Sequence, residues 1–257
     1  MTEAKMTRPA SSYSMRARIG LIVPPTNTVN EAEWSRLLPE GATAHSHRMA
    51  LHTDTQSTEG IAALKTDLEA AVAMLAPMRP DVVAYACTAG SLVTPSDALG
   101  AEISARSGVS VITTADSLVQ ALRHLGAGRI GLATPYSEAM NAHEVAFLAA
   151  HGIETLAVAG LGLGARGAWE YPKIAQTPLA TVERLARQVG AADVAALVIS
   201  CTDFPTLPLI APLERELGIP VLTSNTATLW RCLGHVPDPE ETRRDPRLRA
   251  AGRLFGA

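Results

Sequence analysis

The sequence lacks the features of several large classes of protein. Its 22 lysines and arginines are outnumbered by 25 acidic residues and form no cluster, so nothing indicates nucleic-acid binding. No apolar run approaches the ~18–20 residues that a membrane-spanning helix needs. Residues 1–18 contain no apolar segment of the kind that a secretory signal requires. We therefore expect a cytoplasmic protein that binds neither nucleic acid nor membrane.

Cysteine is scarce, and its spacing argues against two common uses. The three cysteines stand at positions 87, 201 and 232, an odd number lying far apart, which disfavours a disulfide framework and favours a reducing compartment. No CxxC or HExxH motif indicates a metal site, and the cluster of His45, His47 and His52 has no further ligand at suitable spacing. We therefore predict no metal.

One glycine pattern resembles a nucleotide-binding motif. Residues 162–167 read GLGARG, but they lead into WEYPK, which is a poor helix start. The dinucleotide fingerprint needs a helix that opens directly on the glycines. We therefore predict no organic cofactor either.

The chain contains an internal repeat. RIGLIVP at residue 18 returns as RIGLATP at residue 129, and GVSVITT at residue 108 returns as GIPVLTS at residue 218. Cys87 and Cys201 keep nearly the same separation and the same order. These landmarks indicate two copies of one unit of about 110 residues.

Each unit has the pattern of alternating strands and helices. Short, β-branched apolar runs predict strands at 18–23, 43–49, 82–86 and 109–113, and again at 129–133, 154–159, 195–200 and 219–223. Apolar residues at helical spacing predict helices at 28–38, 58–77, 95–106, 137–151, 177–190 and 206–217, with a last helix near 223–234.

This alternation predicts an α/β fold of two lobes, each a parallel sheet flanked by helices, related by a pseudo-twofold axis. We assign residues 1–17 to a flexible tail, 18–114 plus 223–257 to lobe 1, and 115–222 to lobe 2. The charged, proline-rich segment after Gly234 reads as a surface segment or a short helix, and as a candidate oligomer contact. Ligands in such folds bind beyond the carboxyl ends of the strands, so we expect the active site in the cleft between the lobes.

Two Cys-Thr pairs stand at equivalent strand ends. Cys87-Thr88 and Cys201-Thr202 each precede a turn into a helix, where backbone N–H groups bind carboxylates and lower a thiol pKa. Two thiols on opposite faces of a small acid suit either racemisation at an α-carbon or addition to an activated double bond. Cys232 lies in an apolar helical pattern and reads as core.

Several stretches resemble the maleate cis-trans isomerase branch of the aspartate/glutamate racemase superfamily, which includes ectoine-utilisation proteins and is related to arylmalonate decarboxylase. They are RIGLIVPPTNT, ACTAGS, ATPYSEAMN and SCTDFPTLPLIAPLERELGIPVLTSNTATLW. The resemblance implies two Rossmann-like lobes with the site between them.

The same resemblance assigns roles to individual residues. It implies that Cys87 is the nucleophile and Cys201 the proton donor and acceptor. It also implies that the substrate carboxylates are bound by two side chains and two pairs of backbone groups: Asn27, Tyr136, Thr88 with Ala89, and Thr202 with Asp203.

The chain departs from this family in three places. The segment GLGLGARGAWEYPKIAQTP lacks the asparagine that the isomerases carry there, and Arg166 is one candidate to replace it. Asp203 stands where asparagine is common, and its charge is expected to raise the pKa of Cys201. Trp169 adds bulk where small residues are usual.

We therefore predict a cofactor-independent cis-trans isomerase of a small, maleate-like dicarboxylic acid, and we expect a homodimer or higher homo-oligomer. An α-proton racemase of an amino or hydroxy acid is one alternative. An arylmalonate-type decarboxylase is a second, although the resemblance implies that this enzyme has glycine in place of the first cysteine. A protein that binds a small acid without chemistry is a third.

Overall fold

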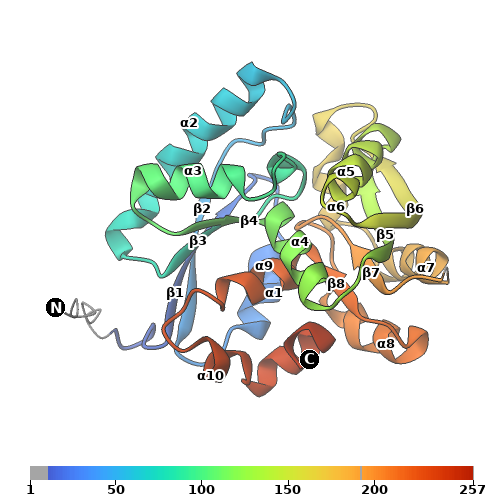
Figure 1. Ribbon diagram of the computed structural model, residues 1–257. Coiled ribbons are helices and arrows are strands. Elements are labelled where there is room, and N and C mark those ends of the chain that lie inside the picture. Colours follow the sequence, from blue (N-terminus) through green and yellow to red (C-terminus); the bar gives the residue numbers. More distant parts are fainter. Residues whose placement is uncertain (1–10, 192, 257) are drawn as a thin grey trace.

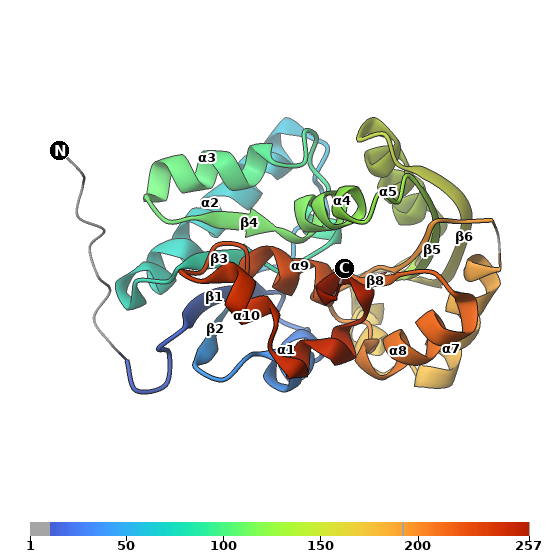
Figure 2. The ribbon, with the colours of Figure 1, turned by 60° about the horizontal axis from the view of Figure 1, so that its bottom comes forward.

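Two four-stranded parallel sheets organise the chain, which the computed structural model describes over residues 11–191 and 193–256 (Figures 1 and 2). Their strand orders are β2-β1-β3-β4 and β6-β5-β7-β8, so the second sheet repeats the topology of the first. The strands are β1 Ala17–Val23, β2 Ala42–Arg48, β3 Val82–Tyr85, β4 Val111–Thr113, β5 Arg129–Tyr136, β6 Glu154–Leu163, β7 Ala196–Ile199 and β8 Val221–Thr223. The predicted two-lobe α/β fold is confirmed.

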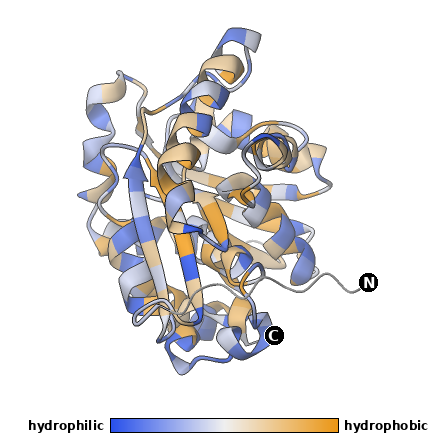
Figure 3. Ribbon diagram, turned by 90° about the vertical axis from the view of Figure 1, so that its left-hand side faces the viewer, coloured by the Kyte–Doolittle hydropathy of each residue, from blue (hydrophilic) through white to orange (hydrophobic). Residues whose placement is uncertain are grey.

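Helices cover both sheets, and Figure 3 shows apolar residues concentrated on the inner strands and hydrophilic residues on outward helix faces. The helices are α1 Asn30–Leu37, α2 Thr58–Leu75, α3 Ala98–Ser107, α4 Thr114–His124, α5 Glu138–Ala150, α6 Pro172–Ala175, α7 Leu179–Gly190, α8 Leu207–Leu217, α9 Ser224–Cys232 and α10 Pro239–Arg243. No helix in the described part of the chain is long and apolar enough to cross a membrane.

Helix α4 was not predicted from the sequence. It occupies the position in the first unit that α9 occupies in the second. Both helices begin directly after a strand, and in each a threonine caps the first turn: Thr113 accepts the N–H of Asp116, and Thr223 accepts that of Thr226. The two helices pack against each other, α9 also contacting β3 and β4 and α4 contacting β8. Each helix thus reaches the sheet of the other unit and ties the halves together.

The third cysteine is structural. Cys232, on α9, is fully buried and belongs to a hydrophobic cluster that includes Ile19 of β1 and Leu229 of α9. The prediction that this residue fills the core is confirmed.

The predicted flexible tail is partly wrong. Residues 1–10 lie outside the described residues, but Ser14 is buried and its Oγ lies 2.7 Å from Thr43 Oγ1. The backbone N–H groups of Arg16 and Ala17 both donate to the carbonyl of Gly41, at 2.8 and 3.1 Å. Pairing with the start of β2 therefore orders the chain before the predicted boundary.

The C-terminal segment folds back onto the body of the protein. It forms short 3₁₀ turns at 246–251 and 253–255, whose Leu248, Ala251 and Leu254 are buried. The N–H of Arg253 donates at 3.0 Å to the carboxylate of Glu214 near the end of α8. The segment predicted to lie on the surface is therefore anchored by a buried apolar stripe and one buried carboxylate.

Candidate active site

One pocket is lined by residues from both sheets, at the carboxyl ends of their central strands. It brings together all eight residues that the sequence singled out: Asn27, Cys87, Thr88, Ala89, Tyr136, Cys201, Thr202 and Asp203. Cys87 and Thr88 follow β3, while Cys201 and Thr202 follow β7 at the equivalent place in the other unit. The two strand ends therefore lie together at one pocket, as expected from their equivalent positions.

Cys87 sits in a close-fitting turn. Its Sγ accepts a hydrogen bond from the N–H of Gly90 at 3.3 Å and another from the Tyr85 hydroxyl. Burial raises the pKa of Cys87, and these two donors oppose the rise because they stabilise the thiolate. A side chain at position 90 would place its Cβ 2.2 Å from the Tyr85 hydroxyl oxygen and 3.1 Å from Sγ, so only glycine fits there.

Cys201 has a different environment and a strained backbone. Its φ is 102°, a value that residues with a side chain rarely adopt, and its N–H donates to Ser224 Oγ at 2.9 Å. Burial raises the pKa of Cys201 to about 12, and the negative charges of Asp203 and Cys87 act in the same direction. The Tyr136 hydroxyl and the N–H of Asp203 bond to the sulfur and oppose the rise. Cys201 is therefore a protonated thiol at neutral pH.

Hydroxyl groups lock the two strand ends together. Thr88 Oγ1 lies 2.8 Å from Ser224 Oγ, the group that also accepts the Cys201 N–H. Thr202 Oγ1 donates to the carbonyl of Ala86 at 3.0 Å. All of these side chains are buried, so the bonds are shielded from water. Ser224 was not predicted as a site residue, and the feature that could have indicated it is its position directly after β8, beside the other strand ends.

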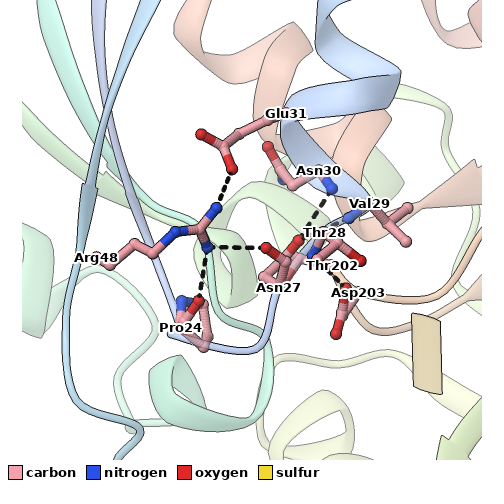
Figure 4. A network of polar contacts seen from close by, with 9 residues as sticks. All are labelled: Pro24, Asn27, Thr28, Val29, Asn30, Glu31, Arg48, Thr202 and Asp203. Carbon is pink, nitrogen blue, oxygen red and sulfur yellow. Dashed lines mark hydrogen bonds and ion pairs between the residues drawn. The ribbon is translucent and has the colours of Figure 1, made fainter. Parts of the chain in front are cut away.

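Asn27 performs a structural task that the sequence did not assign to it. Its Oδ1 accepts the N–H groups of Val29 and Asn30, at 3.1 and 3.0 Å, and so caps the start of α1. Its Nδ2 donates to Thr202 Oγ1 at 3.0 Å, which joins the first unit to the second. Arg48 holds the same loop by donating to the Asn27 carbonyl at 2.8 Å (Figure 4). One N–H of the Asn27 amide is left for a ligand.

Backbone donors are available at both strand ends. Within the described residues, the N–H groups of Thr88, Ala89 and Thr202 donate to no other protein group. Unpaired amide donors at the start of a turn or helix are suited to a carboxylate or to a developing oxyanion. Three of the four backbone positions that the resemblance implied therefore have a free N–H group, while the N–H of Asp203 bonds to the Cys201 sulfur.

Asp203 is a buried carboxylate with one satisfied oxygen. Its Oδ1 accepts the N–H of Thr28 at 2.8 Å, while its Oδ2 is buried and has no hydrogen-bond partner among the described residues. Burial raises the pKa of Asp203 to about 6, opposed by the backbone N–H groups of Thr28 and Val29 and by the charge of Arg48. Figure 4 shows Arg48 and Asp203 on opposite sides of Asn27. The expected effect of Asp203 on the pKa of Cys201 has the predicted sign, but burial is the larger cause.

The remaining wall of the pocket is partly apolar, and the hydroxyl groups of Thr26, Thr53, Ser137 and Tyr171 also line it. Leu163, Tyr171 and Ile174, from the segment that lacks the family asparagine, line the pocket together with Leu51 and Met140.

Arg166 does not line the pocket, and the suggestion that it replaces the asparagine is wrong. Its guanidinium Nε donates to Glu170 at 2.9 Å and the side chain is 70% exposed, because the buried Glu170 carboxylate holds it. Trp169 is also exposed, lying beside the cationic groups of Arg166 and Lys173. Both residues pack on the surface of this loop.

A second buried carboxylate lies behind the pocket. Glu144 on α5 is fully buried and accepts a hydrogen bond from Ser200 Oγ at 2.6 Å, while its other oxygen has no partner among the described residues. Burial raises the pKa of Glu144 to about 7, and the Ser200 bond opposes the rise. Its charge helps to raise the pKa of Tyr136, for which burial is the main cause. Nothing in the sequence distinguished Glu144 from other helical glutamates.

The histidines and glycines that resembled a metal site or a nucleotide-binding motif have structural roles of their own. His52 pairs with Asp67 at 2.8 Å, and His45 bonds to Thr43 on the same strand. In residues 11–191 and 193–256, no three histidine, cysteine or acidic side chains are grouped as a metal site would require. The glycines of the GLGARG stretch have positive φ angles of 74°, 90° and 125° and shape the loop after β6. The loop does not lead directly into a long helix.

Comparison with known proteins agrees with this architecture. A family model described as arylmalonate decarboxylase matches residues 19–255. A maleate isomerase of Nocardia farcinica is 34% identical over 229 residues, which cover 84% of this chain and 88% of that protein. An arylmalonate decarboxylase of Bordetella bronchiseptica is 28% identical, covering 82% of this chain and 87% of its own.

A solved structure gives the same result. It is a cysteine-to-serine mutant of the Nocardia farcinica maleate cis-trans isomerase with a covalently bound succinylcysteine intermediate. It matches with a TM-score of 0.76 and 31% identity, covering 93% of this chain and 98% of that one. The chain therefore belongs to the arylmalonate decarboxylase family and is an isomerase of the maleate isomerase branch within it.

Proposed function

We propose that the chain is a cofactor-independent cis-trans isomerase of a small, maleate-like unsaturated acid, with Cys87 as the nucleophile and Cys201 as the acid and base. The observation that carries this proposal is the placement of two thiols with unlike surroundings in one pocket. Both sulfurs have two hydrogen-bond donors, but the carboxylate of Asp203 lies beside Cys201 and further raises the pKa of that thiol, to about 12. The relatives named maleate isomerase support the same reaction.

The chemistry needs only these two side chains and the backbone donors. The Cys87 thiolate adds to one carbon of the double bond, and the π electron pair moves to the neighbouring carbon, where the attached carbonyl group stabilises it. Cys201 donates its thiol proton to that carbon. The former double bond is now a single bond and rotates. The Cys201 thiolate then removes a proton from the same carbon, the double bond re-forms in the trans geometry, and the Cys87 thiolate leaves.

The surroundings of each group match its proposed role. The pKa of Cys201, near 12, keeps its proton available at neutral pH. The free N–H of Thr202, beside Cys201, stabilises the charge that develops on the substrate oxygen next to the protonated carbon, and the free N–H groups of Thr88 and Ala89 bind the carboxylate on the attacked carbon. The remaining N–H of the Asn27 amide is available to a substrate oxygen. Tyr136 lies next to the Cys201 sulfur and bonds to it through its hydroxyl.

Decarboxylation is the second candidate, because the matching family model and the Bordetella bronchiseptica relative are named for it. Racemisation would use the same two thiols on an α-carbon. The presence of cysteine at both strand ends favours isomerisation over decarboxylation, since a one-thiol reaction leaves Cys87 without a task.

The experiment is proton NMR of the enzyme in D₂O with a panel of acids: maleate and its half-amide, an arylmalonate, and chiral amino and hydroxy acids. The proposal predicts trans product from a cis-unsaturated acid, and no product with the Cys87→Ser variant. Cys232→Ser is the matched control, since that thiol lies in the core. Loss of carboxylate without cis-trans conversion would replace the proposal by decarboxylation, and α-deuteration alone would replace it by racemisation.

A further inference from the structure

The pocket contains one buried polar atom that the proposed mechanism leaves unused. Asp203 lines the pocket and is 6% exposed, and its Oδ2 has no hydrogen-bond partner among the described residues. Beside it, the N–H of Thr202 is also unpaired within the described chain. A buried carboxylate oxygen without a donor costs stability, so its presence in a pocket indicates a donor on the ligand.

The pocket is also poorly suited to a second carboxylate. Asp203 is the one charged side chain among the described residues that line it, and its charge is negative. The nearby cation, Arg48, is committed to the carbonyls of Pro24 and Asn27 and to the carboxylate of Glu31. Two carboxylates brought together in a desolvated site repel each other strongly.

The wall where the family asparagine is missing has one hydroxyl and no charged donor. Leu163, at the end of β6, pairs with Tyr136 of β5, and Ile174 extends an apolar surface from it, while Tyr171 adds a hydroxyl. Because no cation among the described residues lines the pocket to balance a second carboxylate, a neutral group that accepts one hydrogen bond and donates another fits best between Thr202 and Asp203.

We propose that the substrate is a half-amide: a cis-unsaturated acid with one carboxylate and one primary carboxamide. This inference rests on the proposed function and specifies its substrate class. The carboxylate is bound by the N–H groups of Thr88 and Ala89. The amide oxygen accepts the N–H of Thr202, and the amide NH₂ donates to Asp203 Oδ2.

The half-amide also suits the addition step. The electron pair released by attack of Cys87 is delocalised into a neutral amide carbonyl, so no second full negative charge forms on a carboxylate next to Asp203. The amide oxygen carries that developing charge and is held by the Thr202 N–H, where a donor is most effective. A neutral second end therefore lowers the electrostatic cost of both binding and addition.

The test compares maleate with maleamate, its half-amide, by following trans product at pH 8 with the wild-type enzyme and with Asp203→Asn. We expect kcat/KM for maleamate to exceed that for maleate by at least about 10-fold, because sites that hydrogen-bond a substrate group discriminate strongly against analogues without it. Asp203→Asn, whose amide can donate to a carboxylate, is expected to lower this ratio at least about 10-fold. Asp193→Asn is the matched control, since Asp193 is exposed and outside the pocket.

Binding of succinate and succinamate, which have no double bond, is measured by calorimetry on the same variants. A wild-type enzyme that isomerises maleate as well as maleamate, or binds succinate as tightly as succinamate, overturns the half-amide assignment and leaves the isomerase proposal standing. Tight binding of succinamate with no isomerisation of either acid overturns the isomerase proposal instead. An unchanged ratio in Asp203→Asn overturns the role of Asp203.

Discussion

The Tyr136 hydroxyl donates a hydrogen bond to the Cys201 sulfur, although the two residues lie at the ends of different strands. Because this bond stabilises the thiolate form, it eases the release of the Cys201 proton to the substrate. We expect Tyr136→Phe to lower kcat by about 10- to 100-fold, within the range of single positioned donors and acid–base groups. Tyr13→Phe, at an exposed position, is the control. Wild-type kcat in Tyr136→Phe would show that the bond has no catalytic role.

The titration of Cys87 determines how kcat/KM is expected to depend on pH. Burial raises the pKa of Cys87 above its ordinary value, so only a small fraction is thiolate at neutral pH. At pH values below the pKa, the thiolate fraction increases tenfold for each unit by which the pH rises. We therefore expect log kcat/KM to rise with a slope near one between pH 7 and 9. The measurement is initial-rate kinetics of trans-product formation. A profile that is flat or falls over this range would mean that Cys87 reacts from another protonation state.

Glu144 predicts how stability depends on pH. Its pKa is raised from 4.5 in the unfolded chain to about 7 in the folded protein. Below pH 4.5 both states hold the proton, and as pH rises toward 7 the unfolded state loses it first, so stability falls. The fall amounts to about 3 kcal/mol, at 1.36 kcal/mol per unit of pKa.

Glu144→Gln removes this titration. We therefore expect the unfolding free energy of Glu144→Gln, minus that of the wild type, to increase as pH rises from 4.5 to 7, as measured by urea denaturation. Comparing the two proteins cancels the titration of other groups, Asp203 included. A difference that stays constant with pH would contradict the buried, singly bonded state of Glu144.

The backbone conformation of Cys201 leads us to expect that glycine at this position is more stable than alanine. At φ 102° a Cβ atom is strained, whereas glycine adopts this region freely. Cys201→Gly is therefore expected to be more stable than Cys201→Ala by about 1 kcal/mol, roughly the conformational preference of glycine at such angles. At Cys87, where φ is not positive, the order is expected to reverse. Alanine more stable than glycine at both positions would show that Cys201 is unstrained.

The repeat in the sequence explains why so much of the fold was predictable. Strand runs such as 82–86 are short, apolar and β-branched because both faces of a parallel sheet are covered, and the offset between RIGLIVP and RIGLATP aligned the two units. Cys87 and Cys201 were located in the same way, from their position after equivalent strands. Helix α4, which begins at Thr114 directly after β4, was missed although its counterpart α9 begins in the same way and was predicted near 223–234.

The polar contacts between the units were not predictable. Glu33 of α1 accepts the N–H groups of Thr206 and Leu207, each at 2.7 Å, and so caps the start of α8 across more than 170 residues. The packing of the two units determines which groups such a glutamate contacts. From the sequence alone, a single glutamate in a helical pattern is expected to lie on the surface. The same holds for Ser224. Arg166 and Glu170, by contrast, are four residues apart in one loop, and their local ion pair keeps Arg166 out of the pocket.

In the proposed mechanism Cys87 forms a covalent bond to the substrate, while Cys201 donates and removes the proton. Intact-mass spectrometry of Cys201→Ser after incubation with maleamate and with maleate detects this bond, and peptide mapping locates the modified residue. We expect a mass increase equal to one substrate molecule, located on Cys87, and no increase in the Cys87→Ser, Cys201→Ser double variant. An adduct on Cys201 in the wild type, or isomerisation by Cys87→Ser at the wild-type rate, would contradict it.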